Sequence, residues 1–253
     1  MSPARTSLVS GYVLHQRPWR NTSMLIEAFT ADAGRIGLVA RGVRQRGSRT
    51  RPLLEPFQPL LLSWTGRGEL HTLTGVEAET WRAPPAGRAL VAGFYCSELI
   101  LRLLGRDDPN PEAFAAYDAA LFGLAAGGDP EPRLRRFELA LLEALGFAPP
   151  LVDDADEGTP VADDAREYLY VPEVGPRRAL EVRDPAGERT IRVPGAHLHA
   201  LARGELDAPA VLHSARNILR ACLAPHLGPK PLKSRELYRS MYGGKKGTTN
   251  EHE

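Results

Sequence analysis

Cysteine is nearly absent from this chain, which has only Cys96 and Cys222 among its 253 residues. Both lie in apolar runs with helical spacing, so we expect two buried, reduced thiols. Two cysteines in such positions provide neither a disulfide framework nor a cysteine-rich zinc site. A chain of this length can bury a large hydrophobic core without such cross-links.

Long hydrophobic runs are missing as well. No stretch approaches the roughly 18 apolar residues that a membrane-spanning helix needs, and the N-terminal residues hold no apolar run of the kind found in secretory signals. The composition, 43% hydrophobic and 25% charged, is that of an ordinary globular protein. We therefore expect no membrane partner and a cytoplasmic, nucleoid-associated location.

The short motifs of the common enzyme classes do not occur. The chain has no glycine-rich nucleotide loop, no metalloprotease histidine pair and no nucleophile elbow. His197 and His199 are two residues apart near the start of an expected helix, so their side chains point to different sides and suit no shared metal. The sequence predicts no catalytic residue, no metal ion and no cofactor.

Two acidic pairs are the remaining candidates for metal-assisted chemistry. Asp153 with Asp154, and Asp163 with Asp164, would suit a Mg²⁺-dependent nuclease. Both pairs fall in residues 148–165, which are rich in Pro and Asp and have few large apolar side chains. We expect an exposed loop there, without the rigid scaffold that metal coordination requires. The nuclease stays open as an alternative interpretation.

Charge is strongly segregated along the chain, although the net charge is only +1. Residues 1–68 carry ten arginines against three acids, a net charge of +7, and residues 214–246 also carry +7. Residues 107–164, which lie between them, carry −11. Basic segments of this kind indicate a polyanionic partner.

The region from residue 6 to about 80 has the pattern of a small β-barrel. Five short runs rich in Val, Ile, Leu, Thr and aromatic residues are each bounded by Gly, Pro, Asn or Asp. Gly34 suits the positive φ of a hairpin turn between two of these runs. Five strands in about 75 residues fit an OB-fold, and an SH3-like barrel fits nearly as well.

Beyond the Pro- and Gly-containing residues 84–87 the apolar spacing becomes helical. Three helices are expected here, with Asn110 and Asp129 as N-caps of the second and third, and Ser234 is expected to cap the last helix of the chain. The predicted fold class is α+β: an N-terminal five-stranded OB-fold barrel, then a mainly α-helical domain with a small inserted β-hairpin region. The predicted boundaries are 1–82 for the barrel, 83–147 and 195–242 for the helical domain, 148–194 for the insertion and 243–253 for a disordered tail.

Arginines cluster between the third and fourth expected strands, where five fall within residues 40–51 without an acidic residue. Two further clusters combine arginine with tryptophan, around Trp19 and around Trp64. Guanidinium groups contact phosphates and planar rings stack on bases, so these clusters predict nucleic-acid binding without sequence specificity. Trp64 is equally compatible with the barrel core. The arginines of the three clusters are Arg17, Arg20, Arg41, Arg44, Arg46, Arg49, Arg51 and Arg67.

Four segments, taken in order, carry a family resemblance. They are VLHQRPWRNTSMLIEAFTADAGRIGLVARGVRQ (13–45), PFQPLLLSWTGRGELHTL (56–73), PEPRLRRFELALLEALGF (130–147) and LGPKPLKSRELYR (227–239). Together they resemble the bacterial RecO family of recombination mediators over nearly the whole chain. The family has an N-terminal OB-fold, a helical domain and an inserted region that often carries a cysteine zinc site. Residues 148–175 hold no cysteine, so the chain resembles the zinc-free branch and no metal is carried over.

The resemblance implies a protein that is not an enzyme. Such a protein binds single- and double-stranded DNA, anneals complementary strands and, with RecR, helps load the recombinase RecA onto DNA covered by single-stranded-DNA-binding protein. On the barrel the resemblance adds Arg35 to the DNA contacts, and it implies a second group near the C-terminal end. Two groups on one face would neutralise two strands at once, as annealing requires. The second group is Lys230, Lys233, Arg235 and Arg239.

The resemblance also implies a partner site on the third expected helix. In the family, the helical domain binds the acidic, Phe-terminated tail of single-stranded-DNA-binding protein, which suits an apolar pocket with arginines at its rim. Phe137 is also compatible with the core, and the arginines with ion pairs to nearby acids. A protein-interaction adaptor whose basic loop is only solvated stays open as a second alternative. The implied partner-binding residues are Leu134, Arg135, Arg136 and Phe137.

Overall fold

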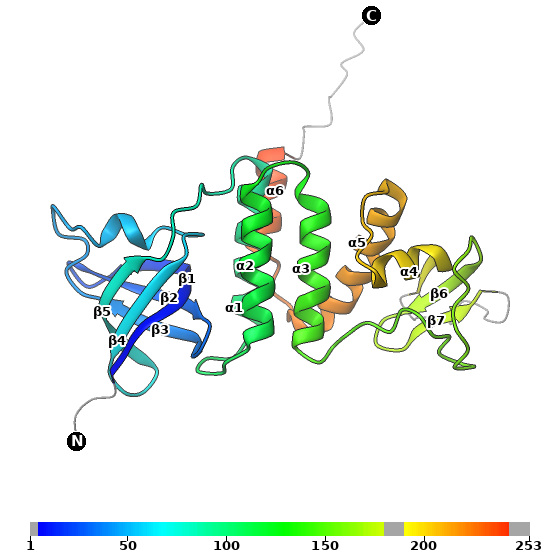
Figure 1. Cartoon of the computed structure of the whole chain (residues 1–253), viewed down its shortest axis with the longest axis horizontal. Helices are drawn as coiled ribbons and strands as arrows, with labels where there is room; N and C mark the ends of the chain where they lie inside the picture. The colour runs from blue at the N-terminus through cyan, green and yellow to red at the C-terminus, as the bar shows by residue number, and fades with distance from the viewer. Residues whose placement is uncertain (1–4, 180–189, 243–253) are drawn as a thin grey trace, which may run out of the picture.

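The protein is elongated and consists of three parts in a row (Figure 1). A computed structural model describes residues 5–179 and 190–242; the predicted disordered tail, 243–253, lies outside them. A barrel occupies one end, three long helices the middle, and a small sheet with two helices the other end. Within the described residues, no helix is both long and apolar enough to cross a membrane.

The N-terminal part is a closed barrel of five strands, which confirms the predicted OB-fold class. The strands are β1 (Arg5–Trp19), β2 (Ser23–Thr30), β3 (Gly34–Ala40), β4 (Leu60–Thr65) and β5 (Leu70–Ala78). The long strand β1 pairs with both β2 and β4. A parallel pairing of β3 with β5 closes the barrel, in the order β1-β2-β3-β5-β4.

Alternating side chains fill the barrel. Strand β4 buries every second residue, namely Leu60, Leu62 and Trp64. Trp64 is only 5% exposed, so its ring belongs to the core and is not available to stack on a base. The hairpin turn predicted at Gly34 is confirmed: its φ is 66°, and a Cβ there would lie 2.1 Å from the carbonyl oxygen of Asp108.

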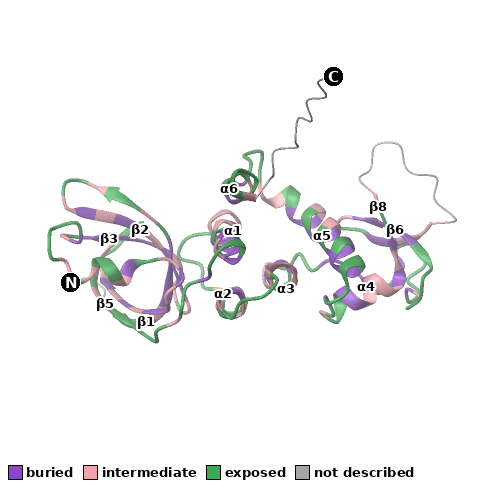
Figure 2. Cartoon of the chain, turned by 90° about the horizontal axis from the view of Figure 1, so that it is seen from above, coloured by how far each residue is buried: buried purple, intermediate pink, exposed green. Residues whose placement is uncertain are grey.

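Three helices form the central layer: α1 (Arg88–Leu103), α2 (Pro111–Ala125) and α3 (Pro130–Ala144). The predicted caps are confirmed, because the Asn110 side chain accepts a hydrogen bond from the second helix and the Asp129 side chain accepts one from the third. Buried residues of the three helices face one another (Figure 2). Their core extends into the later part of the chain and includes Cys96 and Cys222, which are free and buried as predicted.

The barrel and the helices meet in a packed, hydrogen-bonded junction. Tyr12 of β1 donates to Asp118 of α2, and the Arg82 guanidinium lies 2.6 Å from the same carboxylate. Phe57 packs on α1 at Gly93, where a Cβ would come within 3.0 Å of the phenyl ring. Because Tyr12 and Phe57 belong to the same core cluster as the helices, the two parts are joined by more than their connecting segment.

The far end of the molecule is a small sheet packed on two helices. Its strands are β6 (Glu167–Val171), β7 (Gly175–Arg178) and β8 (Ile191–Pro194), in the order β7-β6-β8, and α4 (Gly195–Ala202) and α5 (Pro209–Leu223) follow. The inserted hairpin is present. Its two strands are β6 and β7, which pair antiparallel.

Helix α6 (Lys233–Tyr242) returns to the central layer and packs along α1 (Figure 1). Most of the helix is exposed (Figure 2). Ser234 is its one buried residue. The prediction that Ser234 caps this helix is wrong. The Ser234 hydroxyl donates to Glu98 of α1 instead of accepting a hydrogen bond from its own helix.

Candidate nucleic-acid interface and partner pocket

The arginine-rich loop, residues 41–50, lies over the turn between β1 and β2. The backbone N–H of Arg44 donates to the Thr22 carbonyl at 2.9 Å. The Arg44 guanidinium donates to the carbonyl oxygens of Arg20 and Asn21 at 3.2 and 3.4 Å. These contacts place the loop beside Arg20, so the structure brings two of the predicted arginine clusters together on one side of the barrel.

Seven arginines of the loop, of its end at residue 51, of the end of β1 and of the β1–β2 turn form a strongly cationic surface, which we call the barrel arginine surface. All seven of its arginines are exposed, and none forms an ion pair with an acid among the described residues. The Arg17 guanidinium lies 5.9 Å from the centroid of the Trp19 ring, so an aromatic ring is part of the surface. The charge is therefore available to phosphate groups. The seven arginines are Arg17, Arg20, Arg41, Arg44, Arg46, Arg49 and Arg51.

Arg35, also expected to contact DNA, is used inside the protein. Its guanidinium donates to the carbonyl oxygens of Leu101 and Leu104 at the end of α1, and its Nε lies 3.7 Å from the Glu27 carboxylate. Burial lowers the pKa of this guanidinium, while Glu27 acts in the opposite direction. Arg35 fastens the barrel to α1, so we leave it out of the proposed DNA contacts.

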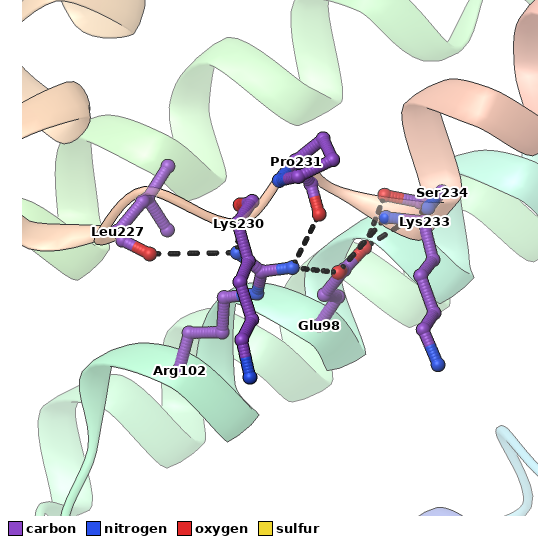
Figure 3. A network of polar contacts seen from close by, with 7 residues as sticks. All are labelled: Glu98, Arg102, Leu227, Lys230, Pro231, Lys233 and Ser234. Carbon is purple, nitrogen blue, oxygen red and sulfur yellow. Dashed lines mark hydrogen bonds and ion pairs between the residues drawn. The ribbon is translucent and has the colours of Figure 1, made fainter.

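The second predicted cationic group divides between two places. The side chains of Lys230 and Lys233 are exposed and extend in the same direction, away from the hydrogen bonds around them (Figure 3). Arg235 and Arg239 are one turn apart on α6 and line a pocket between helices. The barrel arginine surface and α6 belong to different parts of the molecule (Figure 1). The structure thus divides the second predicted group between the segment at and before the start of α6 and the pocket, and both lie outside the barrel.

A pocket of about 850 Å³, which we call the cationic pocket, opens between α1, α3, α5 and α6. Six arginines line it against two acids, which gives the lining a net charge of +4. Apolar side chains and two tyrosine rings supply the rest of the wall. The lining residues are Arg88, Val91, Ala92, Tyr95, Asp129, Pro130, Glu131, Leu134, Arg135, Arg216, Arg220, Ser234, Arg235, Tyr238 and Arg239.

Arg135 is the buried cation of this pocket and is only 6% exposed. Its Nη1 lies 2.9 Å from the carboxylate of Glu138, which also accepts a hydrogen bond from the Tyr95 hydroxyl at 2.5 Å. Burial raises the pKa of Glu138, and Arg135 and Tyr95 oppose that effect. Arg135 Nε has no hydrogen-bond partner among the described residues and lies 3.8 Å from the carboxylate of Glu131. Arg135 is therefore paired with one buried and one partly exposed carboxylate.

Of the four residues expected to bind a partner, Leu134 and Arg135 line the cationic pocket, whereas Arg136 and Phe137 do not. Phe137 is 2% exposed and belongs to the helical core. Arg136 is exposed, and its Nε donates to the Gly204 carbonyl at 3.2 Å. Successive residues of a helix point about 100° apart because a turn holds 3.6 residues. Neighbouring positions on α3 therefore serve the pocket, the surface and the core.

Most of the cationic pocket was missed by the sequence interpretation because its arginines come from separate elements. Arg88 begins α1, Arg216 and Arg220 lie on α5, and Arg239 lies on α6. The local signals were two four-residue spacings, Arg216 with Arg220 and Arg235 with Arg239, each of which puts both residues on one face of a helix. Nothing in the sequence indicated that these two faces would meet α3.

Three of the four acidic residues considered for a nuclease are engaged in other interactions. Asp163 pairs with Arg203 at 3.0 Å, and Asp164 pairs with Arg166 at 3.3 Å. Asp153 is exposed. Across residues 5–179 and 190–242, no group of three or more His, Cys, Asp or Glu side chains is arranged to hold a metal ion.

Asp154 differs from the expected exposed loop, because its side chain is buried. Its carboxylate accepts hydrogen bonds from the backbone N–H groups of Asp156, Glu157 and Arg178 at 3.0 to 3.1 Å. Arg178 belongs to β7, so this carboxylate ties the acidic loop to the sheet. Asp154 is a structural residue of the insertion.

Replacing Asp154 with Ala is expected to lower the free energy of unfolding by about 2 kcal/mol, since three backbone donors lose their acceptor in a partly buried place. Urea denaturation measures the change. Asp153→Ala is the matched control, because the Asp153 side chain is exposed and makes no hydrogen bond within the described part of the chain. Equal stability of the two variants would contradict the structural role of Asp154.

Comparison with known proteins covers nearly the whole chain. The family described as "Recombination protein O N terminal" matches residues 3–81, and the family described as "Recombination protein O C terminal" matches residues 85–236. Similar curated proteins named "DNA repair protein RecO" occur in several bacteria. The one from Alkalilimnicola ehrlichii is 47% identical over 95% of this chain and 94% of its own length. The one from Nitrosococcus oceani is 46% identical over 94% of this chain and 94% of its own length. The one from Klebsiella pneumoniae is 42% identical over 93% of this chain and 94% of its own length.

Proposed function

Because the chain belongs to the RecO family of DNA repair proteins, we propose that it is a recombination mediator. In this proposal it binds single- and double-stranded DNA, anneals complementary strands and helps load RecA onto DNA covered by single-stranded-DNA-binding protein. RecR is the proposed companion in loading, and the proposed location is the cytoplasm, at the nucleoid. The protein acts by binding alone, with no catalytic residue.

The barrel arginine surface is the observation that supports DNA binding most directly. Each arginine that contacts a phosphate releases bound counterions from the DNA, which favours binding at low salt. The OB-fold beneath it is a scaffold that recurs in proteins that bind nucleic acids. Arg67, Lys230 and Lys233 are exposed cations outside this surface and are proposed as additional contacts.

Annealing of two labelled complementary oligonucleotides tests this proposal. The protein is expected to speed duplex formation at low salt and to lose the effect steeply as salt rises, since several phosphate contacts act together. In buffer with Mg²⁺ the strands are expected to stay full length. Fragments would support the nuclease instead, and DNA binding that is absent or insensitive to salt would support the protein-interaction adaptor.

We assign the cationic pocket to the acidic, Phe-terminated tail of single-stranded-DNA-binding protein. The net charge of +4 suits an acidic peptide, and Val91 and Leu134 offer an apolar wall for the terminal ring. Arg135 presents a buried guanidinium, the group that pairs best with a carboxylate. Charge and apolar wall together match both features of such a tail.

Arg220→Glu is expected to weaken binding of an acidic, Phe-terminated peptide at least about tenfold, because the reversed charge faces a ligand of the same sign. Fluorescence anisotropy with a labelled peptide measures the affinity. Arg136→Glu is the matched control, since it makes the same charge change on α3 outside the pocket. An equal loss in both variants would show that general charge, and not the pocket, attracts the peptide.

A further inference from the structure

One carboxylate, Glu98 of α1, receives the first N–H groups of α6. It accepts from the Ser234 backbone at 2.9 Å, from the Ser234 hydroxyl at 2.7 Å and from the Lys233 backbone at 3.0 Å (Figure 3). A helix N-terminus leaves N–H groups without partners and carries partial positive charge, so a carboxylate there is stabilising. Glu98 caps α6 from a position 136 residues away in the chain.

The charge state of Glu98 suits this role. Partial burial by itself raises the pKa of the carboxyl group, but the hydrogen bonds from Ser234 and Lys233 outweigh it, and the pKa is lowered. A carboxyl group whose pKa is lower in the folded protein than in the unfolded chain stabilises the fold at pH values above the unfolded pKa. This stability is lost as the pH falls through the lowered pKa. The cap is therefore fully present at neutral pH.

Arg102, one turn further along α1, fixes the segment that leads into α6. It lies 2.8 Å from Glu98 and donates to the carbonyl oxygens of Lys230 at 2.5 Å and Pro231 at 2.6 Å, with a longer contact to Leu227 at 3.4 Å (Figure 3). Glu98 and Arg102 thus form an ion pair at i, i+4 on α1. Glu98 accepts from the N–H groups at the start of α6, and Arg102 donates to the carbonyl groups of the segment before it.

The opposite end of α6 has a separate contact with α1. The Arg88 guanidinium lies 5.5 Å from the centroid of the Tyr242 ring. The start of α6 meets Glu98 and its end meets Arg88, so the two helices run antiparallel, and ten residues on each span about 15 Å. Apart from Ser234, no residue of α6 is buried. Polar contacts at the two ends, together with the buried side chain of Leu232 just before the helix, set the position of α6.

The cationic pocket depends on that position. Arg235, Tyr238 and Arg239 follow one another at i, i+3 and i+4, and together with Ser234 they form the wall of the pocket that α6 provides. On α1, Val91 and Tyr95 line the pocket and share a helical face with Glu98. The cap and the pocket therefore lie along the same groove between α1 and α6.

We propose that Glu98 is a positioning residue for the cationic pocket: by capping α6 it holds Arg235, Tyr238 and Arg239 in place for an acidic peptide that it does not itself contact. This inference rests on the proposed function of the pocket. Glu98 is not among the residues that line it.

Three variants of the full chain test the role of Glu98. Glu98→Ala removes the acceptor, and Glu98→Gln keeps one acceptor oxygen without the charge. Glu143→Ala removes an exposed carboxylate of α3 that makes no hydrogen bond within the described residues, so it is the matched control. Hydrogen exchange of the amides of residues 233–242 reports on α6, anisotropy with an acidic, Phe-terminated peptide reports on the pocket, and single-stranded DNA affinity reports on the barrel.

Glu98→Ala is expected to speed exchange in α6 and to weaken peptide binding, each at least about tenfold, while DNA affinity changes less than about twofold because the barrel surface is distant. Glu98→Gln is expected to show an exchange rate and a peptide affinity between those of Glu98→Ala and the unmodified protein. Glu143→Ala is expected to match the unmodified protein in both. If Glu98→Ala fails to fold, Glu98→Gln is expected to show smaller changes in exchange and in peptide affinity, in the same direction.

Two results would overturn the inference while leaving the proposed function intact. One is unchanged exchange in α6, which would mean that Glu98 does not hold the helix. The other is faster exchange with undiminished peptide affinity, which would mean that the pocket does not need α6. Failure of the unmodified protein to bind the peptide would instead remove the proposed function of the pocket, and the inference with it.

Discussion

Replacing Arg41, Arg46 and Arg49 together with Glu is expected to weaken single-stranded DNA binding by on the order of 100-fold at about 0.1 M salt. Each phosphate contact on a single strand contributes about 0.7 to the slope of log affinity against log salt, which is roughly fivefold per contact at that salt. The slope is therefore expected to fall by about 2. Arg44 is left in place, because its guanidinium donates to two carbonyl groups of the β1–β2 turn and holds the loop.

Thermal stability is expected to change little in this triple variant, since the three side chains are exposed and exposed charges add little to folding. A second triple variant, with Arg136, Arg166 and Arg192 replaced by Glu, makes the same change in net charge away from the barrel. It is expected to retain most of its affinity and the original salt slope. Equal losses in both, or no loss in the first, would refute the barrel arginine surface as the DNA-binding site.

Arg135→Ala is expected to lower the free energy of unfolding by about 3–5 kcal/mol and to abolish peptide binding. The substitution leaves Glu138 in the core without its cation, although burial already raises the pKa of that carboxyl group. It also removes the buried guanidinium from the cationic pocket. Urea denaturation and peptide anisotropy measure the two effects separately.

The double variant Arg135→Met with Glu138→Gln separates stability from binding. It removes both charges and keeps a side-chain oxygen to accept from the Tyr95 hydroxyl, so much of the lost stability is expected to return. Peptide binding is expected to stay lost. A double variant that binds the peptide normally would show that Arg135 is not a ligand contact, and a stable Arg135→Ala protein would show that the pair is not structural.

The barrel and the central helices could be predicted because their signals are local. The alternation along β4 and the caps at Asn110 and Asp129 act over a few residues, so the sequence contains them directly. The arginine-rich loop was visible for the same reason, since its residues are neighbours in the chain. The contact of this loop with the β1–β2 turn was not visible in the sequence, because the residues of a turn do not indicate which distant segment packs on them.

The cationic pocket could not be predicted, because its wall comes from four helices that are distant in the sequence. Arg135 and Arg136 are adjacent residues of the same type, but their side chains point about 100° apart on α3, so Arg135 lines the pocket and Arg136 lies on the surface. Ser234 has the residue type of a local cap, whereas the group at that helix end comes from Glu98. Exposure could not be predicted either: Trp81 is 78% exposed, although tryptophan is usually mostly buried.

The docking of α6 on α1 has a consequence for the order in which the protein matures. Domains tend to fold as they leave the ribosome, N-terminal part first, so a nascent chain displays the barrel long before Ser234 has been made. Bringing Ser234 to Glu98 closes a loop of 136 residues, an entropic cost that only the finished polypeptide can recover. On the proposed function, a chain that ends before Lys233 is expected to keep the barrel arginine surface but to lack the wall of the cationic pocket that α6 provides.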